Sequence, residues 1–237
     1  MKEYNSRGSN FSLVVLIGPP GVGKGTLAQT CVDSLGWIHI STGTLCRFVA
    51  SCDTPVGKRV AEIINAGNIL DTDLMVQMLH DDLVQKIQKA KEHQSVILLD
   101  GFPRHAGQLS SFLRLMDLCN MQKNTFKFVI FSADWKIIKD RLCGRIVCSN
   151  KKCDRVYCNK EGETNGRCCH MCQAALVRRL DDEDEIIWLK RFTLYEEYKQ
   201  AMLQALNEHQ LSYVVLDAMR DKNDVYRDFM NIIRQTC

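Results

Sequence analysis

The chain has 237 residues, of which 46% are hydrophobic and 25% charged, and its formal net charge is +3. This composition is typical of a soluble protein with one sizeable packed domain that can carry smaller insertions. The mild charge gives no reason to expect nucleic acid or a membrane as a partner. Residues 2–10 are polar, and the apolar stretch after them has only the length of a strand, so we expect neither a signal peptide nor a membrane span and place the protein in the cytoplasm.

The first distinctive segment is a glycine-rich loop after an apolar strand. Leu13–Ile17 is followed by G-P-P-G-V-G-K-G-T at Gly18–Thr26, and helical spacing of apolar residues comes next. Glycines let backbone N–H groups turn toward an anion, and a following helix adds its dipole. Lys24 supplies a positive charge for phosphates, so the loop predicts a nucleotide phosphate site. The general pattern has Ser or Thr after the lysine to bind Mg²⁺, but this chain has Gly25.

Five short apolar runs with little alternation predict the strands of a parallel sheet that is covered on both faces. They are Leu13–Ile17, Trp37–Ile40, Ser95–Leu99, Phe126–Phe131 and Ser212–Leu216. Helical patterns at about residues 56–65, 74–87, 186–209 and 225–233 lie between or after them. We therefore predict an α/β fold with a three-layer α/β/α core around a five-stranded parallel sheet.

Two segments interrupt the alternation of strands and helices. Residues 41–70 show only helical patterns and predict a helical insert, whereas residues 144–182 lack helical periodicity and predict a small β-rich insert. The core then comprises residues 1–40, 71–143 and 183–237.

The third predicted strand ends in an acid. In open α/β sheets the carboxyl ends of the strands face the ligand crevice, so Asp100 is a candidate to hold Mg²⁺ through water. A helix-capping aspartate is the simpler alternative. Arg104, four residues further on, is placed to bind a phosphate in bidentate fashion.

These motifs together resemble adenylate kinase. The resemblance is carried by the loop at Gly18–Thr26, by I-S-T-G with Arg47 four residues beyond the glycine, and by L-D-G-F-P-R at Leu99–Arg104. D-R-x-x-G-R at Asp140–Arg145 and L-x-x-R-x-D-D at Leu176–Asp182 also match in order. That family has glycine after the lysine, so Gly25 supports the resemblance. It implies that residues 41–70 bind AMP and that residues 144–182 form a long LID.

The resemblance also implies roles for individual residues. The expected catalytic residues are Lys24, Arg104, Arg141, Arg145, Arg179 and Arg191. The expected ATP-binding residues are Gly21, Val22, Gly23, Lys24, Gly25, Thr26, Arg141, Arg145, Val156, Tyr157 and Arg220. The expected AMP-binding residues are Thr42, Arg47, Asn68, Ile69, Leu70, Gly101, Phe102, Pro103, Arg104, Gln108, Arg179 and Arg191. Arg141 and Arg145 are four residues apart, one helical turn, and Gln108 has an amide that can read a purine edge.

The sequence departs from the family pattern at two relevant places. Thr44 stands where the family usually has Asp, which removes an acidic contact near Mg²⁺. The chain is one residue longer than the pattern between Asp182 and Tyr195, so either Lys190 or Arg191 fits; we prefer Arg191, because a planar guanidinium holds phosphate better than an ammonium group.

The cysteines are unevenly distributed. Of the 12 in the chain, seven lie between Cys143 and Cys172, which in a long chain without an export signal indicates a metal site. Cys169 and Cys172 form a C-x₂-C pair, and relatives with a metal-binding LID imply Cys148 and Cys153 as the upstream pair. Four thiolates suit a structural Zn²⁺. Cys158, Cys168 and His170 are further potential ligands, so Cys153 with Cys158 remains an alternative upstream pair.

The sequence thus predicts a monomeric enzyme that catalyses ATP + AMP ⇌ 2 ADP with Mg²⁺ and carries a structural Zn²⁺. One alternative is another nucleoside monophosphate kinase, such as one that uses GTP as the donor. A second, from a different class, is a zinc-ribbon module that binds nucleic acid on a degenerate core. Its signal is a modest basic cluster: Lys151, Lys152, Arg155, Lys160 and Arg167.

Overall fold

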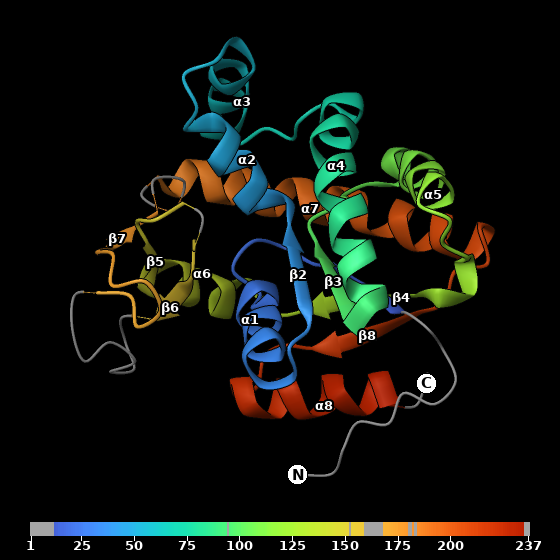
Figure 1. Ribbon diagram of the computed structural model, residues 1–237. Helices are drawn as coiled ribbons and strands as arrows, with labels where there is room; N and C mark the ends of the chain where they lie inside the picture. The colour runs from blue at the N-terminus through green and yellow to red at the C-terminus, as the bar shows by residue number, and fades with distance from the viewer. Residues whose placement is uncertain are drawn as a thin grey trace.

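The computed structural model describes residues 12–93, 95–151, 153–158, 168–179, 182 and 184–234. At its centre lies a five-stranded parallel sheet in the order β2-β3-β1-β4-β8 (Figure 1). The strands are β1 (Ser12–Ile17), β2 (Ile38–Ser41), β3 (Val96–Asp100), β4 (Phe126–Ser132) and β8 (Tyr213–Asp217). The five predicted strands are confirmed, with ends displaced by at most one residue.

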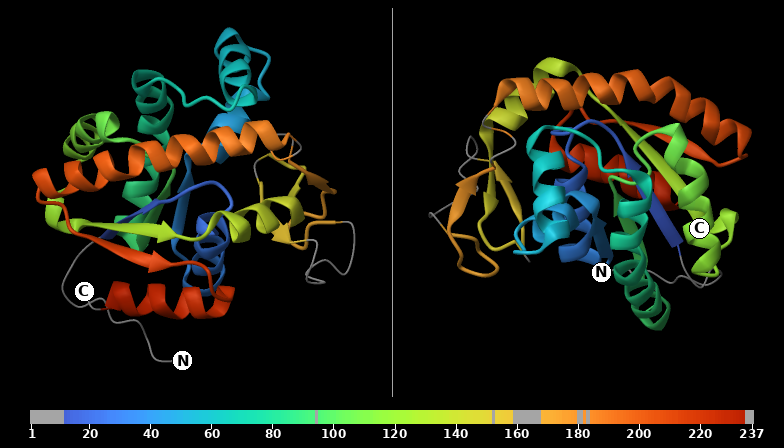
Figure 2. Two further views of the ribbon diagram at one scale, coloured as in Figure 1. Left: turned by 180° about the vertical axis from the view of Figure 1, so that it is seen from behind. Right: turned by 90° about the horizontal axis from the view of Figure 1, so that it is seen from above.

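Helices cover both faces of this sheet, as the two views in Figure 2 show. Helices α1 (Lys24–Leu35) and α8 (Lys222–Arg234) cover one face; α4 (Thr72–His93), α5 (Leu109–Leu118) and α7 (Glu185–Glu208) cover the other. Successive residues of β1 serve the two faces in turn: Leu13 packs on the α4, α5 and α7 side, and Val14 on the α1 and α8 side. The predicted three-layer α/β/α core is therefore confirmed.

The segment after β2 is helical, as predicted. Helices α2 (Thr42–Ala50) and α3 (Pro55–Asn65) stand above the carboxyl edge of the sheet in Figure 1. The Ser41 side chain accepts a hydrogen bond from the backbone N–H of Thr44, and Thr54 caps α3 in the same way through Gly57. Ser41 itself belongs to strand β2, so the helical segment begins one residue later than the expected boundary.

The second interrupting segment contains a small antiparallel sheet in the order β6-β5-β7. Its strands are β5 (Arg145–Cys148), β6 (Val156–Cys158) and β7 (Leu176–Arg178). Helix α6 (Trp135–Gly144) leads into β5, and Arg145 already has extended backbone angles. Arg141 and Arg145 therefore do not occupy one helical turn. The expectation that they did is wrong, because the chain leaves the helix at Gly144.

Helix α5 and two short 3₁₀ segments, η1 (Ala106–Gln108) and η2 (Lys123–Thr125), were not predicted. Of α6, the sequence interpretation expected only the turn at Arg141–Arg145. Helix α5 buries Leu109, Phe112, Leu113 and Met116, which recur at helical spacing and provide the signal that the sequence interpretation missed.

Candidate active site

The glycine-rich loop joins β1 to α1 at the carboxyl edge of the sheet. Gly21 and Gly23 have φ values of 81° and 109°, in the left-handed region that favours glycine. A Cβ on Gly21 would also lie 2.7 Å from Cγ of Leu142, so α6 packs directly against the loop. Lys24 opens α1, and its Nζ donates hydrogen bonds to the carbonyl oxygens of Gly18 (2.8 Å) and Pro19 (3.0 Å). The side chain of Lys24 is thus folded back over the backbone of the glycine-rich loop.

Asp100 lies beside this lysine because strand β3 pairs with β1, which places Asp100 opposite Leu16. Its Oδ1 is 3.9 Å from Lys24 Nζ, and its Oδ2 is 4.0 Å from Nε2 of His39 on β2. Burial lowers the pKa of Lys24 to about 8; the charge of Asp100 opposes this shift, and the charges of Arg104, Arg191 and Arg145 add to it. Burial and three nearby arginines thus disfavour the charged form of Lys24, with Asp100 as the opposing charge, and a bound phosphate would add further negative charge beside it.

A second group of residues follows Asp100 in a tight turn with a cis peptide bond between Phe102 and Pro103. Thr42 Oγ1 donates to the Asp100 carbonyl at 3.2 Å, and Arg104 Nε donates to the Gly101 carbonyl at 2.9 Å. Gln108 is buried, and its Oε1 accepts a hydrogen bond of 2.8 Å from the backbone N–H of Arg104. The amide oxygen that was expected to read a base edge is thus engaged in positioning Arg104.

The remaining arginines approach from α6, the antiparallel sheet and α7. Arg141 donates to the carbonyl oxygens of Val22 (3.0 Å) and Arg220 (3.3 Å). Arg191 lines the same cavity as the glycine-rich loop, whereas Lys190 bonds the Ala66 carbonyl (3.0 Å) and Asn68 Oδ1 (2.7 Å). In this geometry Arg191, and not Lys190, has access to the cavity.

Asp182 organises two of these arginines, a role that the sequence interpretation did not assign. Its side chain is fully buried and pairs with Arg145, whose Nε lies 2.5 Å from Oδ2. Arg179 Nε is 3.9 Å from the same oxygen. The acidic doublet of the L-x-x-R-x-D-D motif was the available signal, although its other member, Asp181, lies outside the described residues.

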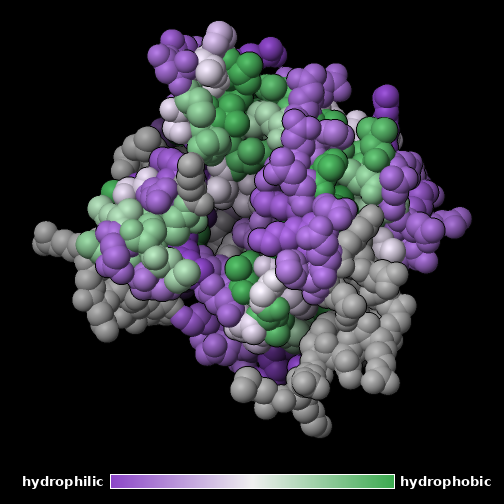
Figure 3. Space-filling model, viewed as in Figure 1, coloured by the Kyte–Doolittle hydropathy of each residue, from purple (hydrophilic) through white to green (hydrophobic). Residues whose placement is uncertain are grey.

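One cavity of about 790 Å³ unites most of the predicted site. It opens on the face shown in Figure 3, between the antiparallel sheet and α4. All of the predicted catalytic and ATP-binding residues line it, as does Asp100. The predicted AMP-binding residues that line it are Arg47, Ile69, Gly101, Pro103, Arg104, Arg179 and Arg191. The others, which do not, are Thr42, Asn68, Leu70, Phe102 and Gln108.

These five residues lie outside the cavity for identifiable reasons, which for Gln108 is its hydrogen bond with the backbone of Arg104. Leu70 and Phe102 are buried in the hydrophobic core, and Thr42 is buried beneath Gly101. Asn68 is exposed and accepts from Lys190. Their expected contacts with a nucleotide stay predictions.

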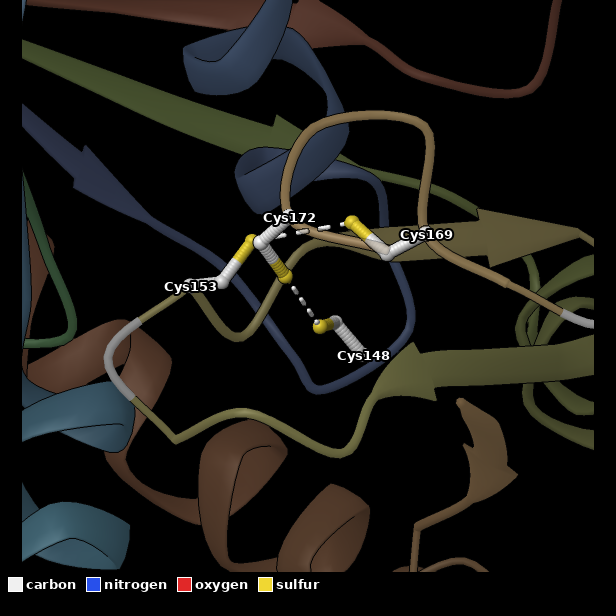
Figure 4. A group of neighbouring side chains, drawn as sticks. All are labelled: Cys148, Cys153, Cys169 and Cys172. Carbon is white, nitrogen blue, oxygen red and sulfur yellow. Dashed lines mark hydrogen bonds between the residues drawn. The ribbon is translucent and has the colours of Figure 1, made fainter. Parts of the chain in front are cut away.

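The four predicted metal ligands converge in the second insert. The Sγ atoms of Cys148, Cys153, Cys169 and Cys172 all lie within 4.8 Å of one another, and the side chains point toward one another (Figure 4). Cys148 ends strand β5, and the other three lie in the segments that follow β5 and precede β7. The Sγ of Cys148 is 3.3 Å from that of Cys172, and the Sγ of Cys153 is 3.7 Å from that of Cys169. Such a set of sulfur ligands could hold a metal ion.

Residues around the four cysteines form hydrogen bonds that favour the thiolate form of Cys169. Burial alone would raise the pKa of Cys169, but the Tyr157 hydroxyl, which donates to its Sγ at 3.1 Å, and nearby backbone N–H groups lower it to about 6. His170 contacts the Tyr157 hydroxyl at 3.0 Å and Arg155 at 3.4 Å. Cys158 and Cys168 are not part of the group of four. In this structure Cys153, not Cys158, completes the group.

The basic cluster of the alternative nucleic-acid hypothesis is only partly described. Lys152, Lys160 and Arg167 lie outside the described residues. Arg155 forms a bidentate pair with exposed Asp33 on α1, so its charge is neutralised within the protein.

Comparison with known proteins gives a consistent result. A family model described as adenylate kinase matches residues 16–211, more than half of the chain. A relative named adenylate kinase from Thermosipho africanus is 29% identical over 94% of this chain and 99% of its own length. Relatives of the same name from Borrelia duttonii and Kosmotoga olearia are each 30% identical, over 93% and 92% of this chain and 96% and 99% of their own lengths. Among the described residues, we find no helix with the length and apolar character needed to cross a membrane.

Proposed function

The chain belongs to the adenylate kinase family, and we propose that it catalyses the reversible reaction ATP + AMP ⇌ 2 ADP. The observation that carries this proposal is the single cavity that Lys24, Asp100 and five arginines share: Arg104, Arg141, Arg145, Arg179 and Arg191. Phosphoryl transfer depends on positioning and on neutralising negative charge rather than on a strong base. A cavity with this set of charges suits that chemistry.

On the donor side, the backbone of Gly21–Thr26 and the ammonium group of Lys24 bind the phosphates of ATP. Arg141 is tied to the loop through the Val22 carbonyl and to the segment before α8 through the Arg220 carbonyl. Arg145 and Arg179 share Asp182, which fixes their direction toward the transferred phosphoryl group. Val156 and Tyr157 form the side of the ATP site that the insert provides. Arg220 lies beside the adenine of ATP.

Asp100 suits a Mg²⁺ ion held through water. Its carboxylate lines the cavity, is 15% exposed, and lies near the loop where Gly25 offers no hydroxyl. Carboxylate oxygens are preferred by Mg²⁺, which retains most of its water ligands. When bound, the ion would neutralise charge on the phosphates of ATP.

On the acceptor side, Arg47 and Arg104 bind the phosphate of AMP. Arg104 is held by the Gly101 carbonyl and by Gln108, so its guanidinium enters the cavity already oriented. Ile69 and Pro103 line the wall beside it. We assign residues 41–70 as the AMP-binding unit, residues 144–182 as the LID and the remainder as the core, in a cytoplasmic monomer.

The four clustered cysteines are proposed to hold one structural Zn²⁺. Their mutual distances and the hydrogen bond from Tyr157 to Cys169 support thiolate ligation. Metal analysis of the purified protein should find about one zinc per chain, and Cys169→Ser should lose it while Cys143→Ser, at an exposed position outside the cluster, retains it. Protein that is fully active and stable without bound metal would contradict the proposal.

The proposed reaction is tested by assaying AMP, CMP, UMP and GMP as acceptors with either ATP or GTP as donor. AMP with ATP should give the highest kcat/KM, and Lys24→Ala should abolish ADP formation. A matched control is Lys58→Ala, an exposed lysine that pairs with exposed Asp53. GTP as the better donor would favour the alternative kinase, and RNA binding without kinase activity would favour the nucleic-acid module.

A further inference from the structure

The two residues that follow Cys153 reach in different directions across the active-site cavity. Asp154 contacts helix α2, and Arg155 contacts helix α1. Both residues line the cavity, and both belong to the loop that carries one of the clustered cysteines. The insert therefore touches the acceptor side and the donor side of the cavity through adjacent residues of opposite charge.

The contact of Asp154 is buried and specific. Its side chain is only 3% exposed, Oδ2 accepts a hydrogen bond of 2.8 Å from Thr44 Oγ1, and the same oxygen forms an ion pair with Nη2 of Arg47. Asp154 also has a φ of 44°, a region in which Asp and Asn are among the few residues found with a side chain. The loop thus adopts an uncommon conformation while delivering this carboxylate to α2.

Two polar atoms of this contact remain unsatisfied. Oδ1 of Asp154 and Nε of Arg47 are buried without a hydrogen-bond partner among the described residues. Buried polar groups are costly unless they are paired. A guanidinium has five N–H donors, so Arg47 can hold Asp154 through Nη2 and still offer Nε to an anion in the cavity.

We propose that Asp154 is a positioning residue that couples docking of the insert to binding of the acceptor phosphate. Asp154 docks on Arg47 and Thr44 from the opposite side of the cavity and orients the guanidinium for the phosphate. A phosphate that orders Arg47 in turn favours docking of Asp154, because coupling between two binding events is reciprocal. The inference rests on the proposed function for the identity of the acceptor, AMP. Position 44 of this chain is Thr where the family usually has Asp, and Asp154 of the insert brings a carboxylate to that position.

The contact of Arg155 provides the matched control. Arg155 pairs with Asp33 on α1, with Nη1 2.6 Å from Oδ2, and Val156 N–H donates to Gln29 on the same helix. This contact also joins the insert to the rest of the protein, but it does not involve α2. A purely structural role for Asp154 would therefore be reproduced by Asp33→Asn, whereas a role in aiming Arg47 would not.

The experiment measures AMP binding to the full chain by calorimetry, with and without a non-hydrolysable ATP analogue. Asp154→Asn keeps the shape of the side chain and tolerates positive φ, so the fold should persist. We expect the analogue to tighten AMP binding to the wild type by about fivefold or more. Asp154→Asn should reduce this factor to less than about twofold, and Asp33→Asn should preserve it. Thr44→Val should weaken it partially.

The outcomes separate the two proposals. A wild-type chain that does not bind AMP would overturn the proposed function, and this inference with it. If AMP binds but the analogue has the same effect on Asp154→Asn as on the wild type, only the coupling role is wrong. Tighter AMP binding to Asp154→Asn without the analogue would also overturn it, because the carboxylate would then compete with the phosphate for Arg47.

Discussion

Strand β1 of the central sheet buries Leu13, Val14 and Val15 almost completely, whereas strand β7 of the antiparallel sheet leaves Val177 39% exposed. The central sheet is covered by helices on both faces, and its apolar clusters extend over most of the core. Around the antiparallel sheet, by contrast, the buried cluster that the described residues form consists of Cys148, Tyr157 and Cys169. Apolar burial stabilises the first region, while the second has too little of it and depends on its cysteines and on contacts with α1 and α2. The two regions should therefore respond differently to the same kind of damage.

The largest expected effect is on the core. Phe112 is fully buried, and its ring centroid lies 6.3 Å from that of Phe102 and 5.7 Å from those of Phe126 and Phe128. Phe112→Ala should lower the free energy of unfolding by about 3–5 kcal/mol, because it removes a large side chain and leaves a cavity. Urea denaturation measures this loss. Phe48→Ala, on α2 at a site that is 38% exposed, is the control, and an equal loss in both variants would show that the depth of apolar burial does not set the loss of stability.

The next effect concerns the place where the insert rejoins the core. Asp182→Asn removes the charge that orients Arg145 and Arg179, so we expect kcat for ADP formation to fall by about 10²-fold. Steady-state kinetics measure the change. Asp184→Asn should leave kcat unchanged, since the Asp184 side chain caps α7 and Asn caps helices equally well. Normal turnover by Asp182→Asn would show that these arginines need no buried acid.

Loss of metal from the cysteine cluster should have a smaller effect on global stability. A chelator, or Cys169→Ser, should lower the melting temperature by about 4–8 °C, which corresponds to roughly 2 kcal/mol for a chain of this length. The insert should lose protection in hydrogen exchange while the central sheet retains it. An unchanged melting curve, together with a lack of bound zinc, would refute the dependence of the insert on metal.

The smallest effect is expected at the contact between Arg155 and Asp33. A hydrogen bond from Arg155 lowers the pKa of Asp33 below its ordinary value. The stabilisation is therefore present above about pH 4 and is lost as the pH falls through the lowered pKa. Asp33 is 43% exposed, so Asp33→Asn should cost less than about 1 kcal/mol at pH 7. Unfolding free energies of the two proteins should converge below pH 4, and a constant difference down to pH 3 would argue against the ion pair.

Local sequence patterns predicted the central sheet well. Each strand begins and ends within one residue of its prediction, because strands covered on both faces must be apolar along their whole length. Helix α5 was missed although Leu109, Phe112 and Met116 carry a helical signal. The loop at Gly18–Thr26 was also predictable, since its glycines answer a local requirement for positive φ.

The antiparallel insert was less predictable from local patterns. The cysteine spacing allowed two upstream pairs of metal ligands, Cys148 with Cys153 or Cys153 with Cys158, because either separation can be spanned by a loop. Only the folded chain brings Cys148 and Cys153 together with Cys169 and Cys172 and leaves Cys158 outside the group.

By itself the sequence predicted the α/β core, the glycine-rich loop after β1, the order of the helical and the β-rich segments, and the arginines that the structure places around one cavity. Tertiary structure alone decided which acids hold those arginines. Asp182 meets Arg145 across 37 residues, and Asp154 meets Arg47 across 107. Short-range periodicity reports burial and backbone conformation, but an ion pair between distant segments depends on how those segments pack. The L-x-x-R-x-D-D motif marked Asp182 as notable without showing its partner Arg145, and no local pattern linked Asp154 to Arg47.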